Sequence, residues 1–254
     1  MDARLVVSDD CNWAISLQGD GPDLNAAVRM FRRGGSLRVC TGVIPAFPDR
    51  VVILCSDFNA LDANDDQGIH MAAAHLVDLL NGALFLDDPA RRPLSVGAVH
   101  RRHANGEYGV SITLPAISVT FRGVSAVGCA AGEEVPHDAI SWLRKGMDDD
   151  RVSDVLAYMR ADPGWFELYK VVETIQADIG VVKSGVRWHG SRKLKDFGRD
   201  AQLERHSRQW CKRMKIESSN AMALSDARRL VREFVVSWLN WKQGEPTPTK
   251  NAGS

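Results

Sequence analysis

The stretch LSVGAVHRRHANGEYGVSITLPAISVTF (residues 94–121) decides how the N-terminal half of this chain folds. Mostly apolar side chains recur there at every second position, in three adjacent runs. The runs are Leu94, Val96, Ala98 and His100, then Tyr108, Val110, Ile112 and Leu114, then Ile117, Val119 and Phe121. The pair Asn105–Gly106 in the first connection is typical of a tight hairpin turn. This alternation predicts an antiparallel meander with one face on a core, and it places His100 in that core or at its rim.

The residues before this stretch predict a mixture of strands and helices. Runs rich in β-branched residues predict strands over 13–17, 36–44 and 50–58. Helices are expected over 21–35 and 66–81. Pro22 suits the first position of the earlier helix, and Gly34 suits a left-handed cap at its end. The later helix has Asp65 or Asp66 as its expected N-cap.

From about residue 136 the apolar period changes to steps of three and four, which is the period of a helix that buries one face. A helix after Asp162 as N-cap and Pro163 as first helical residue is expected to end at Gly180. The stripes are Val152, Val155, Leu156 and Met159, then Trp165, Leu168, Val172, Ile175 and Ile179, then Leu224, Ala227, Val231, Phe234, Trp238 and Trp241.

These patterns predict an α+β protein in which a mixed, β-rich N-terminal unit with an antiparallel meander precedes an all-helical C-terminal unit. We expect the β-rich domain over residues 1–132 and the helical domain over 136–242. Residues 243–254, rich in Pro, Gly and Thr, are expected to form a disordered tail.

Composition favours a soluble protein of the cytoplasm. The chain has 254 residues, of which 44% are hydrophobic and 25% are charged, as in ordinary globular proteins. The acidic N-terminus is unlike a secretory signal, and no apolar run predicts a membrane span. Five scattered cysteines without a CxxC pair indicate a reducing compartment rather than a disulfide framework.

Two glycine-containing segments are weak matches to nucleotide-binding motifs. GDGPDL (19–24) lacks the third glycine of a dinucleotide fingerprint, and Pro22 suits a helix start better. GVRWHGSR (185–192) has Ser191 where a phosphate-binding loop needs Lys. Neither segment therefore predicts a nucleotide site.

The acidic stretch SDFNALDANDDQGIH (56–70) is a candidate metal site. Carboxylates that follow a strand are frequent ligands of Mg²⁺ in hydrolases and transferases. The candidate ligands are Asp57, Asp62, Asp66 and His70. The alternative is structural: Asp65 or Asp66 caps a helix whose N-terminal dipole favours nearby anions. No cofactor is expected beyond this Mg²⁺.

The segment 183–215 concentrates positive charge, with 11 basic and 3 acidic residues in a chain that is neutral overall. If 203–215 is one helix, Arg205, Arg208, Lys212 and Lys215 share one face, opposite Leu203, Trp210 and Met214. His206 and Cys211 do not converge on such a helix, which argues against a metal or redox site. Upstream cations extend the basic face, and they are Arg192, Lys193, Lys195 and Arg199.

The sequence therefore favours a non-enzymatic interaction protein whose basic face contacts nucleic acid or an acidic protein surface. A solvated helix face that balances the acidic residues 1–182 is the structural alternative. Two other functions remain open: a metal-dependent hydrolase or transferase that uses the acidic stretch, and a self-associating structural subunit. No membrane partner is expected, and the oligomeric state is not predicted.

Overall fold

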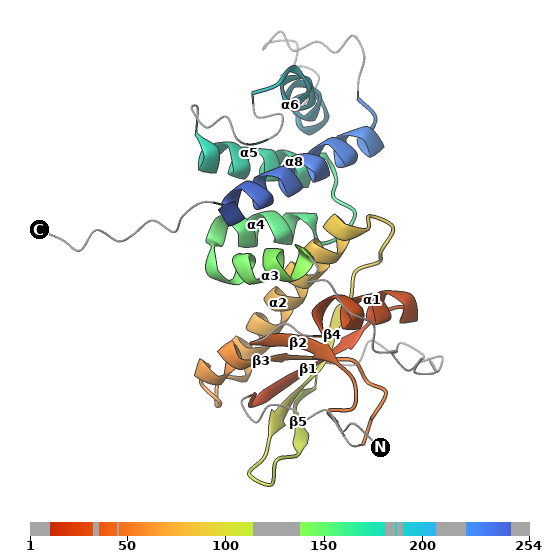
Figure 1. Cartoon of the computed structure of the whole chain (residues 1–254), viewed down its shortest axis with the longest axis vertical. Coiled ribbons are helices and arrows are strands. Elements are labelled where there is room, and N and C mark those ends of the chain that lie inside the picture. The colour runs from red at the N-terminus through yellow and green to blue at the C-terminus, as the bar shows by residue number, and fades with distance from the viewer. Residues whose placement is uncertain are drawn as a thin grey trace, which may run out of the picture. The chain divides into compact units, whose positions relative to one another are not determined.

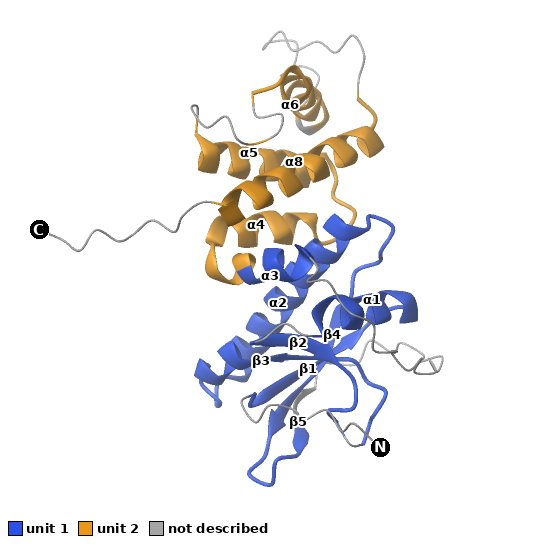
Figure 2. Ribbon diagram, in the orientation of Figure 1, with its two compact units in different colours: residues 1–144 blue, residues 145–254 orange. Residues whose placement is uncertain are grey.

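A computed structural model describes residues 11–32, 36–44, 46–113, 138–180, 186, 190–206 and 222–244. Contacts between residues divide the chain into two compact units, residues 1–144 and 145–254 (Figure 2). The first unit contains an antiparallel sheet, and the second is helical, so the α+β class expected from the sequence is confirmed. The domain boundary expected at 132–136 falls within 114–137, outside the described residues.

The sheet of the first unit has five strands in the order β2-β3-β1-β4-β5, and every neighbouring pair is antiparallel (Figure 1). The strands are β1 (Trp13–Gln18), β2 (Leu37–Cys40), β3 (Val52–Cys55), β4 (Ser95–Arg102) and β5 (Tyr108–Thr113). The hairpin between β4 and β5 forms as the 94–121 stretch predicts, and Gly106 adopts a φ of 85° in its turn. The third run of that stretch lies outside the described residues.

Two helices and one 3₁₀ turn lie between the strands of this unit in the chain. Their bounds are α1 (Gly21–Phe31), η1 (Ser56–Ala60) and α2 (Asp66–Asp87). The side chain of Asp65 accepts a hydrogen bond of 2.8 Å from the Gly68 amide, so Asp65 is the N-cap of α2, as predicted. Asn81 exchanges hydrogen bonds of 2.8 Å in both directions with the backbone of Leu94, which ties α2 to the start of β4.

Several element ends differ from the sequence expectation. Strand β3 ends at Cys55 because the chain turns into η1, so the strand ends three residues before the expected residue 58. Helix α2 continues through Gly82 to Asp87, beyond residue 81, because its last turns are buried. Helix α1 ends at Phe31 with Arg32 as its C-cap, and Gly34 lies outside the described residues.

Helix α2 is also the helix of the described chain that is long and apolar enough to cross a membrane by length and composition. Of its most apolar window, 67% is buried inside the protein. That burial is the pattern of the core helix of a soluble protein rather than of a membrane span.

Both faces of the sheet are buried near its centre. Ile15, Ile53 and Val99 pair across three strands on one face, and each is almost fully buried. On the other face Ala14 pairs with Leu54 and with His100, and all three are inaccessible to solvent. The alternation of residues 94–100 predicts only one buried face. The second face is buried because residues distant in sequence, such as Leu54 and Tyr108, pack on it.

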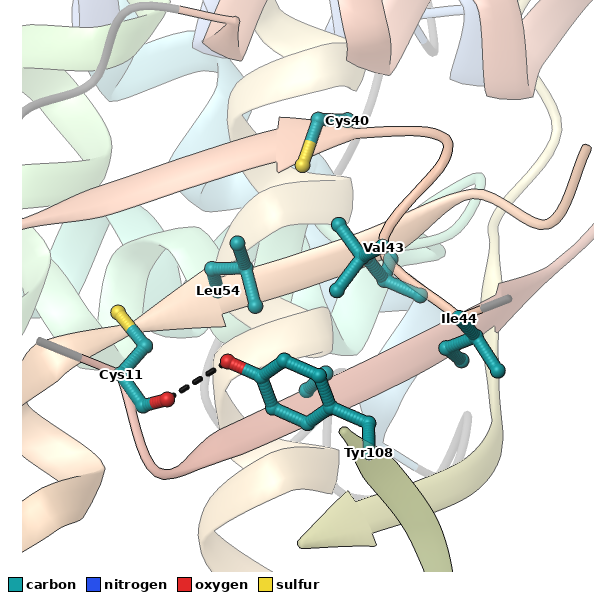
Figure 3. Close-up of a cluster of buried hydrophobic side chains, with 8 residues drawn as sticks. Cys11, Cys40, Val43, Ile44, Leu54 and Tyr108 are labelled. Atoms are coloured by element: carbon teal, nitrogen blue, oxygen red, sulfur yellow. Dashed lines mark hydrogen bonds between the residues drawn. The ribbon is translucent and has the colours of Figure 1, made fainter. Parts of the chain in front are cut away.

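A small apolar cluster lies on this second face (Figure 3). The hydroxyl of Tyr108, at the start of β5, donates a hydrogen bond of 2.6 Å to the carbonyl oxygen of Cys11, just before β1. The bond therefore joins residues that are 97 positions apart. The cluster consists of Cys11, Ala14, Cys40, Val43, Ile44, Val52, Leu54 and Tyr108.

The described helices of the C-terminal half are α3 (Asp138–Asp148), which spans the boundary between the units, α4 (Asp150–Met159), α5 (Trp165–Ile179), α6 (Arg192–Arg205) and α8 (Leu224–Gly244) (Figure 1). The three apolar stripes expected from the sequence lie on α4, α5 and α8. Helix α5 packs against α4, α6 and α8. Fully buried stripe residues include Leu168 and Ile175 on α5 and Phe234 and Trp238 on α8.

Helix α5 ends where the sequence predicts but begins later than expected. Helix α5 ends at Gly180 as predicted, with a φ of 67° that a residue without a side chain adopts readily. It begins at Trp165 after Gly164, two residues later than predicted, because Glu167 accepts a hydrogen bond of 3.0 Å from the Gly164 amide. Helix α8 reaches Gly244, and the tail residues 245–254 lie outside the described part.

Candidate functional site

Helix α6 is anchored by a short apolar stripe. Ser191 caps its N-terminus by accepting a hydrogen bond from the Leu194 amide. Leu194 and Phe197 are buried, and the Phe197 ring stacks on Trp165 of α5 with 5.9 Å between the ring centroids. One turn later Gln202 donates a hydrogen bond of 3.0 Å to the Tyr169 hydroxyl on α5. This packing orients the opposite face of α6 toward solvent.

The first turn of α6 carries Arg192, Lys193 and Lys195, and all three are exposed. No acidic residue lies in that turn. The carboxylate paired with Arg192 is Asp196, at 3.9 Å, and the Arg192 side chain is 95% exposed. Cations at a helix N-terminus meet the positive end of the helix dipole, which disfavours them. The arrangement therefore concentrates positive potential at one exposed point.

Arg199 differs from these three cations. Its side chain is half-buried and lies 3.4 Å from both Asp196 and Asp200. The two carboxylates offset the charge of the guanidinium, so Arg199 contributes little positive potential, although the sequence groups it with the three exposed cations. The periodicity of α6 alone does not reveal this difference.

Asp200 also holds the chain that returns to α6. Its side chain is buried, and its Oδ2 atom accepts a hydrogen bond of 2.9 Å from the Met222 amide. Residues 207–221 lie outside the described part, but the chain leaves α6 after Arg205 and is tied to the same helix again at Met222. The residues on both sides of segment 207–221 are therefore tied to α6.

One continuous helix over 203–215, as the sequence analysis assumed, is wrong. Helix α6 ends at Arg205, because the next residue, His206, is extended with φ −115° and ψ 157°. Because the helix is interrupted at His206, a helical projection cannot place Arg205 on one face with the cations that follow it. Arg205 is the last helical residue, and Arg208, Lys212 and Lys215 lie outside the described residues.

The acidic stretch forms capping contacts rather than a cluster. Asp57 is exposed in η1, and Asp62 accepts a hydrogen bond of 2.9 Å from the Asn64 amide. Asp66 and His70 lie on successive turns of α2, whose cap is Asp65. Within the described chain, which includes all four candidate ligands, no group of three His, Cys, Asp or Glu side chains could hold a metal ion. The geometry thus gives the Mg²⁺ hypothesis no support.

Burial makes the described titratable groups in the core of the first unit poor nucleophiles and poor bases. Burial raises the pKa of the Cys40 and Cys55 thiols to about 11, so both remain protonated at neutral pH. Burial, together with Arg50, lowers the pKa of His100. Both ring nitrogens of His100 lack a hydrogen-bond partner, which is consistent with a neutral imidazole in the core.

Sequence reasoning missed a charged network in the second unit. Lys242, near the end of α8, lies 2.5 Å from Asp149 and 3.1 Å from Asp178. Asp178 also pairs with Arg151 and accepts a hydrogen bond of 3.0 Å from the Trp238 indole. These residues come from the start of α4, the end of α5 and the end of α8. The sequence shows only that Trp238 and Lys242 lie one turn apart on a helix. This spacing does not identify the carboxylates with which they interact.

Comparison with known proteins finds no family model, no curated protein and no solved structure that matches this chain. A function must therefore be argued from the residues and their geometry. Of the surfaces described above, the first turn of α6 has the clearest chemical character, because its charge is exposed and of one sign.

Proposed function

We propose that this protein binds nucleic acid through the phosphate backbone, with the first turn of α6 as the contact surface. The observation that carries the proposal is the group of three exposed cations in a helical turn without an acidic residue. Their charges oppose the helix dipole in the free protein. A bound phosphate removes that opposition, since it pairs with the side chains and accepts hydrogen bonds at the helix N-terminus.

The surrounding charge supports an extended anion rather than a single ion. Residues 183–215 carry 11 basic and 3 acidic side chains, and both ends of the segment 207–221 are tied to α6. We include the whole predicted set of cations in the contact: Arg192, Lys193, Lys195, Arg199, Arg205, Arg208, Lys212 and Lys215. Contacts of this kind give affinity and salt dependence without reading base sequence.

We further infer that binding takes place in a reducing compartment, with the cytoplasm as the simplest choice. The described cysteines Cys11, Cys40 and Cys55 are free thiols, which supports this setting. The two other functions considered from the sequence, a metal-dependent enzyme and a self-associating subunit, have no specific observation in their favour.

The test is an anisotropy titration of labelled single-stranded RNA and duplex DNA at several salt concentrations. The variant is Lys193→Glu with Lys195→Glu, and the control is Arg160→Glu with Arg229→Glu, which changes net charge equally at exposed positions elsewhere in the unit. We expect wild-type affinity to fall steeply with salt. The α6 variant should lose at least about tenfold in affinity, and its salt slope should flatten by about one for each lost phosphate contact.

The control variant should retain most of the wild-type affinity. Equal losses in both variants would indicate only a general charge effect and would contradict the proposed surface. Tighter binding to a poly-glutamate peptide than to either nucleic acid would replace nucleic acid with an acidic protein as the partner. Absence of binding to RNA and DNA at low salt would reject the function.

A further inference from the structure

A polar surface cavity of about 420 Å³, largely open to solvent, lies at the turn between β4 and β5, in the first unit. Its lining comes from that turn and from the residue that precedes β1. The lining residues are Asn12, Arg102, His103, Ala104 and Gly106. The Arg102 amide donates a hydrogen bond of 2.8 Å to the Asn12 carbonyl, which fixes the two sides of the cavity relative to each other.

The turn holds the guanidinium of Arg102 in place. Its Nε atom donates a hydrogen bond of 3.2 Å to the carbonyl oxygen of Gly106. Gly106 has a φ of 85°, in the left-handed region that favours glycine, and its amide donates 2.9 Å to the His103 carbonyl. The guanidinium is therefore positioned by the backbone of a tight turn rather than left to sample many rotamers.

The imidazole of His103 is positioned by a second glycine. Gly109 on β5 has no side chain, and a Cβ atom at that position would clash with Nε2 of His103. The ring therefore occupies space that any other residue at 109 would fill. The backbone of His103 is fixed as well, since its amide donates 2.8 Å to the Glu107 carbonyl.

The side chains that line the cavity are suited to an anion. The guanidinium of Arg102, the imidazole of His103 and the side-chain amide of Asn12 are N–H donors, whereas the backbone amide of Asn12 already donates to Asn59. Glu107, the acidic residue of the turn, accepts a hydrogen bond of 3.0 Å from Asn105, which is not among the lining residues. The fixed positive charge of Arg102 in the lining favours an anion, and its planar guanidinium fork matches two oxygens of a phosphate.

We propose that this cavity is a binding site for the phosphate group of a small molecule. A volume of about 420 Å³ lies within the range of small-molecule sites in proteins. The proposal does not rest on nucleic-acid binding by α6, because the two sites are built from different residues in different units. Each site can therefore fail without the other.

The test follows backbone amide resonances of the full chain by NMR during titration with inorganic phosphate, phenyl phosphate and acetate. We expect saturable shifts centred on Asn12, His103 and Gly106 with both phosphates, and only weak, unsaturated shifts with acetate. Saturation by acetate at equal concentration would replace the phosphate specificity with general anion binding. Shifts that do not saturate with phosphate at millimolar concentration would overturn the site.

Two variants test the geometry. Gly109→Ala leaves every charge in place but displaces the His103 ring, so it should weaken phosphate binding at least about tenfold. His103→Ala, in an exposed turn, should do the same and remains informative if Gly109→Ala fails to fold. His75→Ala, which removes an exposed histidine from α2, is the matched control and should leave binding unchanged.

The variants also separate this site from the α6 surface. The Lys193→Glu, Lys195→Glu protein should bind phenyl phosphate as the wild type does, and Gly109→Ala should keep its affinity for nucleic acid. Loss of phenyl phosphate binding in the α6 variant would assign the small phosphate to α6 and reject the cavity.

Discussion

The Nζ atom of Lys242 lies 3.1 Å from Oδ2 of Asp178, and the two side chains are only 10% and 11% exposed. The contact joins the last turn of α8 to the last turn of α5. Charges that lose this much water need close partners, and Lys242 has a second one in Asp149, at 2.5 Å. The ion pair is largely shielded from solvent and connects helices, so it should contribute more to stability than an exposed surface pair.

Lys242→Met should destabilise the protein by about 3 kcal/mol, because it leaves Asp149 and Asp178 without their shared cation in a poorly hydrated site. Urea unfolding followed by far-UV circular dichroism measures the change. Arg229→Ala is the control on the same helix: its pair with Asp226 is mostly exposed, so the loss should be ~0.5 kcal/mol or less. Equal losses in the two variants would mean that the network contributes no more than a surface pair.

The same network predicts acid lability. Burial alone would raise the pKa of Asp178, but hydrogen bonds from Arg151, Trp238 and Lys242 outweigh it and hold the pKa below its usual range. Asp149 shows the same balance, with Lys242 as the main opposing partner. A lowered carboxyl pKa adds stability above the unfolded-state value of about 3.9, and this stability is lost as the pH falls through the lower folded-state value.

The difference in unfolding free energy between wild type and Asp178→Asn should therefore narrow as the pH falls from 7 to about 3. Urea titrations at a series of pH values measure it. A constant difference across this range would show that the Asp178 carboxylate gains nothing from its ionisation in the folded protein.

Lys195→Glu should stabilise the free protein while it weakens nucleic-acid binding. The new carboxylate would lie at the positive end of the α6 dipole and one turn before Arg199, which together contribute about 0.5–1 kcal/mol. A thermal melt without nucleic acid measures the gain, and Lys195→Gln should give a smaller one. A lower melting temperature for Lys195→Glu would mean that Lys195 already has a favourable role inside the folded protein.

Buried thiols should resist modification until the protein unfolds. Cys11, Cys40 and Cys55 are buried, and burial raises the pKa of Cys40 and Cys55 to about 11, while the thiolate is the reactive form. A protein with Cys129→Ser and Cys211→Ser isolates these three. At pH 8 it should react with a disulfide reagent many times more slowly when native than when unfolded in urea. Rapid native reaction would show that the buried faces of the sheet open readily.

Much of the fold follows from local patterns in the sequence. The β4–β5 hairpin at Asn105–Gly106, the cap at Asp65 and the end of α5 at Gly180 each depend on a few adjacent residues, and each is confirmed. The burial of His100 also follows from its parity in the strand. These features are predictable because the backbone preferences of neighbouring residues decide them.

The candidate sites could be predicted only in part. The sequence locates positive charge in segment 183–215, but it extends one helix past Arg205, because a helical projection contains no information about where packing ends. It also treats Arg199 as equivalent to Lys195. In the structure Arg199 pairs with the buried Asp200, which also accepts a hydrogen bond from the amide of Met222, 22 residues later. The ring of His103 depends similarly on the missing side chain of Gly109 across the hairpin.

By itself the sequence determined the class of the fold and the segment in which positive charge is concentrated, since periodicity and composition are properties of adjacent residues. Only the tertiary structure decided which charges stay exposed. Asp178 meets Lys242, Asp200 meets Arg199 and Met222, and no group of three acidic or histidine ligands forms among the described residues of the stretch 56–70. Such contacts depend on how helices and strands pack, because packing brings together side chains that the chain itself keeps apart.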